Sequence, residues 1–304
     1  MQLRFATGGA ASGWAEVQRS ASPFLVSSED SVLHDMATHP GTLARYVVVE
    51  DGQVLGLTRV RDNGPGEVRA MIQVHADHRA RGVGRQLLDQ VLRVADGRSI
   101  AGVVNGDDHS IAVSEHWGFV RERSHRISAV DPRQVPPPPD APEDLLVVPL
   151  ADVAPALVWA CLREVALDDP SGLTRPVPLD HFVATDWHDP LQRPDLGRAA
   201  LDADGRVVAY AQITAAHGRA WNAMTGTLPE HRGRGLATLV KAHALAACAA
   251  AGITTCGTGN DVENAPMLAV NDRLGYRPAV TTWSARRAPG RSNRSPGPSS
   301  LSRP

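Results

Sequence analysis

The segment Thr227–Ala249 reads TLPEHRGRGLATLVKAHALAACA and decides how the second half of the chain folds. The apolar run 220–228 predicts a strand, and Pro229 ends it because proline has no backbone N–H to donate to a ladder. The turn Arg232-Gly233-Arg234-Gly235 follows, and the Ala- and Leu-rich remainder favours a helix. The order is therefore strand, glycine-rich turn and helix N-terminus.

This turn has the properties of a binding site for a phosphate or pyrophosphate. A helix N-terminus carries unpaired amides and partial positive charge. Gly233 and Gly235 let an anion approach those amides because no Cβ stands in the way, and Arg232 and Arg234 add full charge. The segment matches neither the P-loop pattern G-x-x-x-x-G-K-[ST] nor the dinucleotide pattern G-x-G-x-x-G, so those two kinds of site are not indicated.

The pattern Arg232-x-x-Gly235-x-Ala237 resembles the R/Q-x-x-G-x-G/A signature with which GNAT acetyltransferases hold the pyrophosphate of acetyl-CoA. The following sequence resembles the next element of that family, a strand that ends at Asn260 and a helix that ends in Leu-Gly-aromatic at 274–276. Pro266 suits the first turn of this helix, and Gly275 suits its C-terminal cap.

The same landmarks occur earlier in the chain. The segment 79–84 fits the signature again, and Gly118-Phe119 matches Gly275-Tyr276. The matching landmarks are Arg79 and Arg232, 153 residues apart, Asn105 and Asn260, 155 apart, and Gly118 and Gly275, 157 apart. Three landmarks that recur in order with little drift indicate a duplicated domain. The chain as a whole resembles a tandem GNAT protein over roughly residues 1–286.

The length of 304 residues suits two such domains. We expect an N-terminal GNAT domain at 1–131, a Pro-rich linker at 132–144, a C-terminal GNAT domain at 145–287 and a disordered tail at 288–304. Alternating strands and helices predict an α/β fold. The resemblance implies that each domain is a mixed, mostly antiparallel sheet flanked by helices, with two central strands that splay apart.

Composition limits the partners. A net charge of −2 gives no indication of a nucleic-acid or membrane partner. The three cysteines have no disulfide or metal spacing, and no apolar run is long enough to span a membrane, so we expect a cytoplasmic protein without a metal. We expect a monomer or a homodimer.

The resemblance also implies which residues hold acetyl-CoA, the co-substrate of the family. In the C-terminal copy these are Thr227, Leu228, Arg232, Gly233, Arg234, Gly235, Leu236, Ala237, Thr238, Asn260 and Asn264. In the N-terminal copy they are Val74, Arg79, Arg81, Gly82, Val83 and Gly84. The C-terminal copy has the fuller pattern, and we expect activity there.

The catalytic residues are less well defined. Many GNAT enzymes place a tyrosine four residues before the final glycine, as the acid for the leaving thiolate. Asn271 and Ser114 occupy these positions here, so Asn271 is a candidate hydrogen-bond donor or a helix-packing residue. The predicted strand 220–228 has no acid, and Glu230 in the turn after it is either a general base or a surface charge. Asp168, Asp169 and Asp186 are candidates for attracting an amine, or loop residues.

The resemblance therefore implies an N-acetyltransferase that moves an acetyl group directly from acetyl-CoA to a primary amine of a small molecule. The alternative is a non-catalytic acetyl-CoA-binding sensor or scaffold, which the absent tyrosine and the absent strand acid favour.

Overall fold

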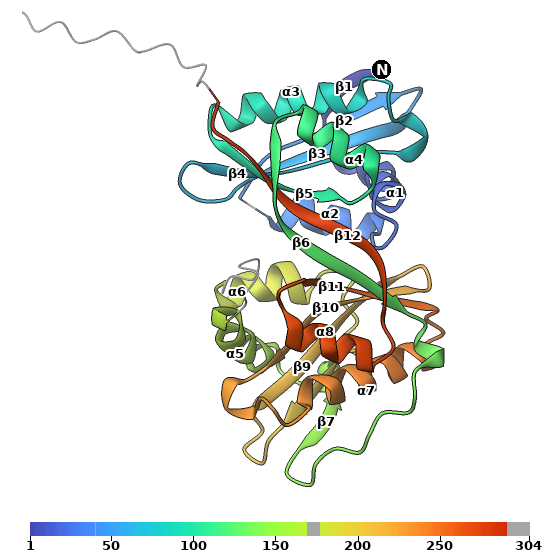
Figure 1. The fold of residues 1–304 in the computed structure, drawn as a ribbon, viewed down its shortest axis with the longest axis vertical. Helices are drawn as coiled ribbons and strands as arrows, with labels where there is room; N and C mark the ends of the chain where they lie inside the picture. Colours follow the sequence, from blue (N-terminus) through green and yellow to red (C-terminus); the bar gives the residue numbers. More distant parts are fainter. Residues whose placement is uncertain (40, 169–176, 291–304) are drawn as a thin grey trace, which may run out of the picture. The chain divides into compact units, whose positions relative to one another are not determined.

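The structure is a computed structural model of the 304-residue chain, and it describes residues 1–39, 41–168 and 177–290. The chain forms two units that exchange segments. Unit 1 comprises Met1–Ala21, Pro40–Arg123 and Trp283–Pro304. Unit 2 comprises Ser22–His39 and Ser124–Thr282. Each unit takes segments from both halves of the sequence (Figure 1). The sequential domain boundaries given above remain a prediction.

Unit 1 is built on a mixed sheet in the order β1-β2-β3-β4-β5-β12. Its strands are β1 (Gln2–Phe5), β2 (Thr42–Glu50), β3 (Gln53–Asp62), β4 (Glu67–Val74), β5 (Ser99–Asn105) and the second part of β12 (Arg277–Arg287). The pairs from β1 to β4 are antiparallel, and β5 runs parallel to β4. The β2–β3 hairpin turns at Asp51 and Gly52, which both have positive φ (49° and 81°), as its Asp-Gly sequence predicts.

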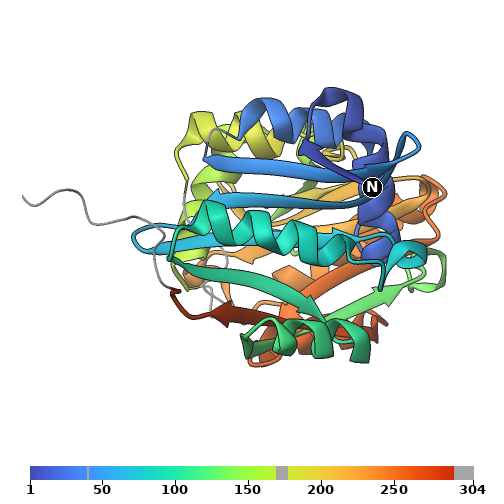
Figure 2. The same cartoon turned by 90° about the horizontal axis from the view of Figure 1, so that it is seen from above.

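Three helices accompany this sheet. They are α1 (Ala11–Ala21), α3 (Val83–Ala95) and α4 (Asp108–His116). Helix α3 packs on β2, β3 and β4 through Val83, Leu87 and Val91, and it lies across these strands in Figure 2. The 3-10 turn η2 (Ala76–His78) joins β4 to the loop in front of α3.

Unit 2 repeats the arrangement with the strand order β6-β11-β10-β9-β8-β7. Its strands are the second part of β6 (Phe119–Val130), β7 (Leu146–Pro149), β8 (Arg198–Leu201), β9 (Val207–Ala216), β10 (Arg219–Thr227) and β11 (Thr255–Asp261). Its α-helices are α2 (Glu29–Thr38), α5 (Pro155–Val165), α6 (Leu179–Phe182), α7 (Leu236–Ala250) and α8 (Ala265–Arg273). The 3-10 turns η3 (Pro132–Gln134) and η7 (Pro229–His231) and the short π-helix η6 (Val183–Trp187) also belong to it.

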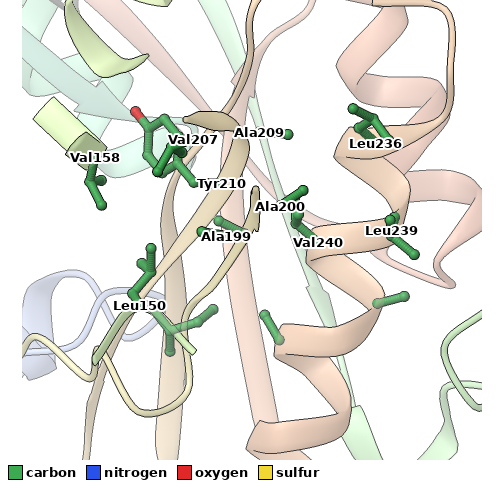
Figure 3. Close-up of a cluster of buried hydrophobic side chains, with 14 of the residues drawn as sticks. Leu150, Val158, Ala199, Ala200, Val207, Ala209, Tyr210, Leu236, Leu239 and Val240 are labelled. Atoms are coloured by element: carbon green, nitrogen blue, oxygen red, sulfur yellow. The ribbon is translucent and has the colours of Figure 1, made fainter. Parts of the chain in front are cut away.

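The core of unit 2 lies on both faces of its sheet. Leu236, Leu239 and Val240 of α7 face the small residues Ala200 and Ala209, which let the helix approach the strands closely (Figure 3). Because side chains alternate along a strand, Tyr210 points to the opposite face, where it lies near Val158 of α5 (Figure 3).

The exchanged strands complete each sheet. The second part of β6 pairs antiparallel with β11 in unit 2, from Cys256 opposite Val130 to Asp261 opposite His125. In unit 1 the Arg123 backbone N–H donates to Ser284 Oγ of β12 at 3.2 Å. A GNAT-like sheet therefore forms in each unit from strands of both halves of the sequence.

The structure confirms the mixed, mostly antiparallel α/β fold and the helix C-terminus at Gly275, whose φ is 86°. Within the predicted linker, Val135 and Ala141 pack against the core of unit 2. In the tail, residues 291–304 lie outside the described residues.

Candidate functional site

The turn before α7 in unit 2 has an unusual backbone. Gly233 and Gly235 both lie in the left-handed region, with φ of 77° and 79°. Glycine adopts this region without the steric cost of a Cβ, so two glycines can stand one residue apart here. Arg232, Gly233, Arg234 and Gly235 are all exposed, and no described atom lies within 4 Å of a Cβ built at either glycine. The turn is therefore open on its outer side.

Helix α7 begins at Leu236 with amides that the helix itself does not use. The first intrahelical bond is donated by the Leu239 N–H to the Gly235 carbonyl at 3.0 Å, and Gly235 supplies no side-chain cap. Helix geometry thus leaves the amides of Leu236, Ala237 and Thr238 without partners inside the helix. These amides and the positive end of the helix dipole form an anion-binding surface.

The turn before α3 in unit 1 has the same conformation. Ala80 and Gly82 have φ of 59° and 82°, which match Gly233 and Gly235, and the Gln86 N–H bonds the Gly82 carbonyl at 3.2 Å. The amides of Val83, Gly84 and Arg85 are those that the helix leaves unbonded. The copy keeps the backbone shape even though alanine replaces one glycine and adopts a strained φ.

The arginines of the C-terminal turn have specific neighbours. Arg234 Nη2 donates to both carboxylate oxygens of Asp144, at 2.8 and 2.7 Å, and this ion pair holds the pKa of Asp144 below its usual value. Arg232 Nε donates to the Thr227 carbonyl oxygen at 3.3 Å. Thr227 Oγ1 is buried and has no hydrogen-bond partner among the residues that the structure describes.

In the N-terminal turn both arginines face carboxylates. Arg81 Nη2 donates to Glu50 Oε2 at 2.7 Å, and Arg79 Nη1 lies 3.9 Å from Asp107 Oδ1. Both contacts reduce the positive charge that the turn can offer to an anion.

The central strands of unit 2 splay apart. Strands β10 and β11 pair in parallel at Arg219–Thr255, Ala220–Cys256 and Trp221–Gly257, and the pairing then stops although both strands continue. A bulge in β10 starts at the same level, because the register with β9 shifts between Asn222 and Met224. Ala223, the bulged residue, has no paired residue in either neighbouring strand, and it is exposed.

Trp221 helps to hold the gap open. A Cβ at Gly257 would lie 2.6 Å from the Trp221 ring, and one at Gly259 would lie 3.3 Å from it. The indole therefore rests directly on the bare backbone of β11. The two glycines fit this contact because any larger residue would displace the ring.

The central strands of unit 1 splay without a bulge. Strands β4 and β5 pair only from Glu67–Ser99 to Arg69–Ala101, so the gap is present. The ladder between β3 and β4 runs from Asp62–Val68 to Gly56–Val74 without a register shift. Val74 ends this ladder, at the position that Thr227 has in the other copy.

The asparagines that follow the gap in unit 2 have defined hydrogen-bond partners. Asn271 of α8 is fully buried, and its Nδ2 donates to Asn260 Oδ1 at 2.6 Å. Asn264 is the N-cap of α8, where its Oδ1 accepts the Met267 N–H at 3.2 Å. Asn271 thus fixes the side chain of Asn260 at the end of β11.

Glu230 is hydrogen-bonded to an arginine rather than to these asparagines. It is exposed in η7, and its Oε1 accepts a hydrogen bond from Arg206 at 2.8 Å. A backbone hydrogen bond, and then this arginine, hold the pKa of Glu230 below its usual value, which weakens it as a base at neutral pH. The geometry is that of a surface ion pair.

Two features of this site could not be predicted from the sequence. The bulge at Ala223 leaves no mark in a run of small and apolar residues. Asp261 at the end of β11 is the one acid on the two strands that border the gap, and it is buried, with Oδ2 4.0 Å from His125 Nδ1. Only the exchange of β6 brings this histidine to unit 2, so no local pattern could place it.

The remaining sequence candidates are placed as follows. Asp186 Oδ2 accepts a hydrogen bond from Thr185 Oγ1 at 3.0 Å in η6. Asp168 ends a short 3-10 turn (Ala166–Asp168), and Asp169 lies outside the described residues. Within 1–39, 41–168 and 177–290 no three His, Cys, Asp or Glu side chains gather as a metal site would require. None of the helices described has the length and apolarity of a membrane span.

Comparison with solved structures supports the fold. A tandem GNAT protein from the clavulanic acid biosynthesis pathway has a TM-score of 0.75 at 20% identity, with 95% of this chain and 99% of that chain covered. A GCN5-related N-acetyltransferase from Sphaerobacter thermophilus has a TM-score of 0.68 at 17% identity, with 95% and 96% covered.

Comparison of sequences leads to the same family. A mycothiol acetyltransferase of Clavibacter michiganensis subsp. michiganensis (strain NCPPB 382) is 31% identical over 258 residues, which cover 83% of each chain. A mycothiol acetyltransferase of Clavibacter sepedonicus is 29% identical over 231 residues, which cover 74% of this chain and 75% of that protein. The model of the acetyltransferase (GNAT) family matches residues 13–119 and again residues 159–276. The chain therefore belongs to the acetyltransferase (GNAT) family, a family of acyltransferases, and carries its domain twice in tandem.

Proposed function

We propose that the C-terminal copy transfers an acetyl group directly from acetyl-CoA to a primary amine of a small molecule. The observation that carries this proposal is one continuous path in unit 2. The gap between β10 and β11 opens beside the bulge at Ala223, and β10 then leads through η7 to the open turn in front of α7. Acyl transfer from a thioester of CoA requires that two negative charges be stabilised, that of the CoA phosphates and that of the developing oxyanion. This path offers backbone amides to both.

The turn Arg232–Gly235 and the first amides of α7 would hold the pyrophosphate. The pantetheine arm would lie in the gap against Thr227 and Leu228, where its amides can replace missing strand partners. Leu228 already donates its N–H to the Val208 carbonyl at 2.9 Å, and its carbonyl accepts the His231 N–H at 2.9 Å, so the arm would use the second lone pair of that carbonyl. The buried Thr227 Oγ1 gains a partner in this arrangement.

The thioester carbonyl would reach the bulge. Ala223 lies outside both ladders and is exposed, so its amide would be placed to donate to the oxyanion of a tetrahedral intermediate. A thiol pKa of about 8.5 lets the CoA thiolate leave near neutral pH with little help from an acid. This chemistry suits a site in which an asparagine replaces the usual tyrosine.

Residues beyond the gap would serve in support. Asn260 would contact the arm, held in place by Asn271, and Asn264 would face the same ligand from the start of α8. Asp261 is our first candidate for the acceptor of the amine proton, because it is the acid on the strands that border the gap. Glu230 is the weaker candidate, since Arg206 already binds it.

Several observations support the C-terminal copy as the active one. The N-terminal copy keeps the turn and the gap, but its β4 has no bulge, and carboxylates face both of its arginines. The name of the relatives, mycothiol acetyltransferase, supports a small-molecule acceptor. Action in the cytoplasm, as a monomer or homodimer and without nucleic acid or membrane, remains part of the proposal.

The test is release of free CoA thiol when acetyl-CoA is mixed with a panel of small primary amines. We expect thiol release that depends on one class of amine, together with one equivalent of acetylated amine found by mass spectrometry. The variant Arg232→Ala in the C-terminal turn should lose most of this activity, while Arg79→Ala in the N-terminal turn should keep it. A protein that binds acetyl-CoA and releases no thiol with any amine would instead be the non-catalytic sensor.

A further inference from the structure

Arg234 of the C-terminal turn is held by the segment that links the two halves of the sequence. Both of its bonds to Asp144 come from Nη2, at 2.8 and 2.7 Å, and its Nη1 lies 3.3 Å from His231 Nδ1. The pair is open to solvent, with 35% of the Arg234 side chain and 61% of the Asp144 side chain exposed. A ligand that approaches the turn from outside can therefore reach it.

The N-terminal copy builds the same three-residue arrangement. Arg81 Nη2 donates to Glu50 at 2.7 Å, and its Nη1 lies 3.1 Å from His78 Nδ1. His78 and Arg81 are the duplicates of His231 and Arg234, at the common offset of 153 residues. The two carboxylates are not duplicates, because Glu50 ends β2, whereas Asp144 precedes β7. The contact has thus been kept while the residue that supplies it has changed.

A carboxylate and a phosphate compete for the same guanidinium. A carboxylate is planar and a phosphate is tetrahedral, but both are oxyanions that accept two parallel N–H bonds from arginine. The phosphate carries more negative charge. Exposed ion pairs contribute little free energy, because solvent screens them and two long side chains must be ordered. Asp144 therefore reduces the net positive charge of the turn, but a more strongly charged anion can displace it from Arg234.

The rest of the linker is anchored separately. His243 Nε2 on α7 lies 3.0 Å from the Pro139 carbonyl oxygen, and Val135 and Ala141 pack against the core of unit 2. Leu145, directly after Asp144, is buried. Loss of the Arg234 contact would then free the short stretch 142–144 and leave both flanks in place.

We propose that Asp144 is a built-in competitor of the ligand phosphate for Arg234, so that occupation of the C-terminal site releases the end of the interdomain linker. The inference rests on the proposed binding of acetyl-CoA to this turn. It adds a coupling between the cofactor site and the segment that connects the two halves of the sequence. Removal of the Asp144 charge should strengthen binding, whereas a carboxylate that merely orients Arg234 for the phosphate would have the opposite effect.

The test is calorimetric titration of acetyl-CoA into wild type, Asp144→Asn and Glu143→Gln at low ionic strength. Glu143 is the neighbouring exposed acid, so its variant makes the same change in net charge without touching Arg234. We expect Asp144→Asn to bind about twofold to fivefold more tightly than wild type, the range that an exposed ion pair supplies, and Glu143→Gln to bind as wild type does. In an Arg234→Gln background, Asp144→Asn should change nothing.

Hydrogen exchange over residues 135–147 supplies the second readout. We expect acetyl-CoA to speed exchange at the end of the linker in wild type and to have no such effect in Asp144→Asn. Unchanged or weaker binding by Asp144→Asn, or slower exchange at the linker on binding, would overturn the inference and leave the proposed function standing. Failure of wild type to bind acetyl-CoA at all would overturn both.

Discussion

Asp107 and Asn264 occupy the same place in the two copies and differ by one charge. Each is the N-cap of the helix that follows the splayed strand, and each accepts the backbone N–H three residues ahead, of Ser110 at 3.0 Å and of Met267 at 3.2 Å. Asp107 also faces Arg79 of its turn. The cap requirement is met equally well by both residues, so the difference is electrostatic.

Exchange of these two caps should shift affinity for acetyl-CoA in opposite directions. By analogy with the Arg79–Asp107 contact, Asn264→Asp should bring a negative charge toward Arg232, and we expect affinity to fall about threefold to tenfold, with a larger effect at low salt. Asp107→Asn should raise any affinity of the N-terminal copy. Calorimetry at two salt concentrations measures both changes, and thermal unfolding should show equal stability of the variants. Equal affinity of Asn264→Asp and wild type would remove this cap from the site.

The bond between Asn271 and Asn260 should contribute to both stability and binding. Asn271→Leu keeps the number and branching of the side-chain heavy atoms but leaves Asn260 without its buried partner and adds volume, and we expect a loss of about 1–3 kcal/mol in the free energy of unfolding. Acetyl-CoA should bind more weakly because Asn260 is no longer fixed. Urea unfolding and calorimetry on the same samples measure the two effects. Ser114→Val at the equivalent buried position of the other copy is the control for binding and should leave it unchanged.

The contact between Trp221 and Gly257 makes a local test of the gap. A Cβ at Gly257 would lie 2.6 Å from the indole, so Gly257→Ala must displace the ring, and we expect a loss of about 1–3 kcal/mol in stability. Gly41→Ala is the matched control, since no described atom lies within 4 Å of its Cβ. Near-ultraviolet circular dichroism should report the movement of the tryptophan. Identical spectra and stabilities for both variants would show that the ring does not rest on β11.

The fold followed from sequence because its signals are local. The strand Arg219–Thr227, the turn of Arg232 and Gly235 and the helix that ends before Gly275 are each encoded by consecutive residues. Because the same landmarks recur in the first half of the sequence, the fold of that half could be predicted from the second. Features that depend on partners distant in the chain were beyond such reasoning.

Three of those features shape the site. The exchange of β6 and β12 sets His125 opposite Asp261, although more than 130 residues separate them. The packing of the linker brings Asp144 to Arg234, 90 residues away. The bulge at Ala223 is a property of how β10 meets β9 and not of the residue itself. None has a periodicity or a motif that a linear reading could find.

Lys241 should make the stability of unit 2 depend on pH. It is 2% exposed on α7, its Nζ lies 5.1 Å from the centre of the Tyr276 ring, and burial lowers its pKa from 10.5 to about 8. Below pH 8 the lysine is protonated in both states, and the cost of burying the charge is fully present. Between pH 8 and 10.5 the unfolded chain binds more protons than the folded one, so stability should rise with pH.

The size of this effect is about 3 kcal/mol, from the two pKa values. Urea unfolding of wild type and Lys241→Met at pH 7.5 and 10 measures it. We expect Lys241→Met to be the more stable protein at pH 7.5, with most of the difference lost at pH 10. Parallel pH profiles for the two proteins would contradict the assignment of the buried charge.

The most direct test of the central claim is a calorimetric titration of acetyl-CoA into wild type, Gly235→Glu and Gly82→Glu. Both glycines have positive φ at the start of a helix, so the two substitutions impose the same backbone strain and place the same carboxylate beside the same amides. We expect Gly235→Glu to abolish binding and Gly82→Glu to leave the strong binding event intact. Full binding by Gly235→Glu, or loss of binding only in Gly82→Glu, would contradict a C-terminal acetyl-CoA site.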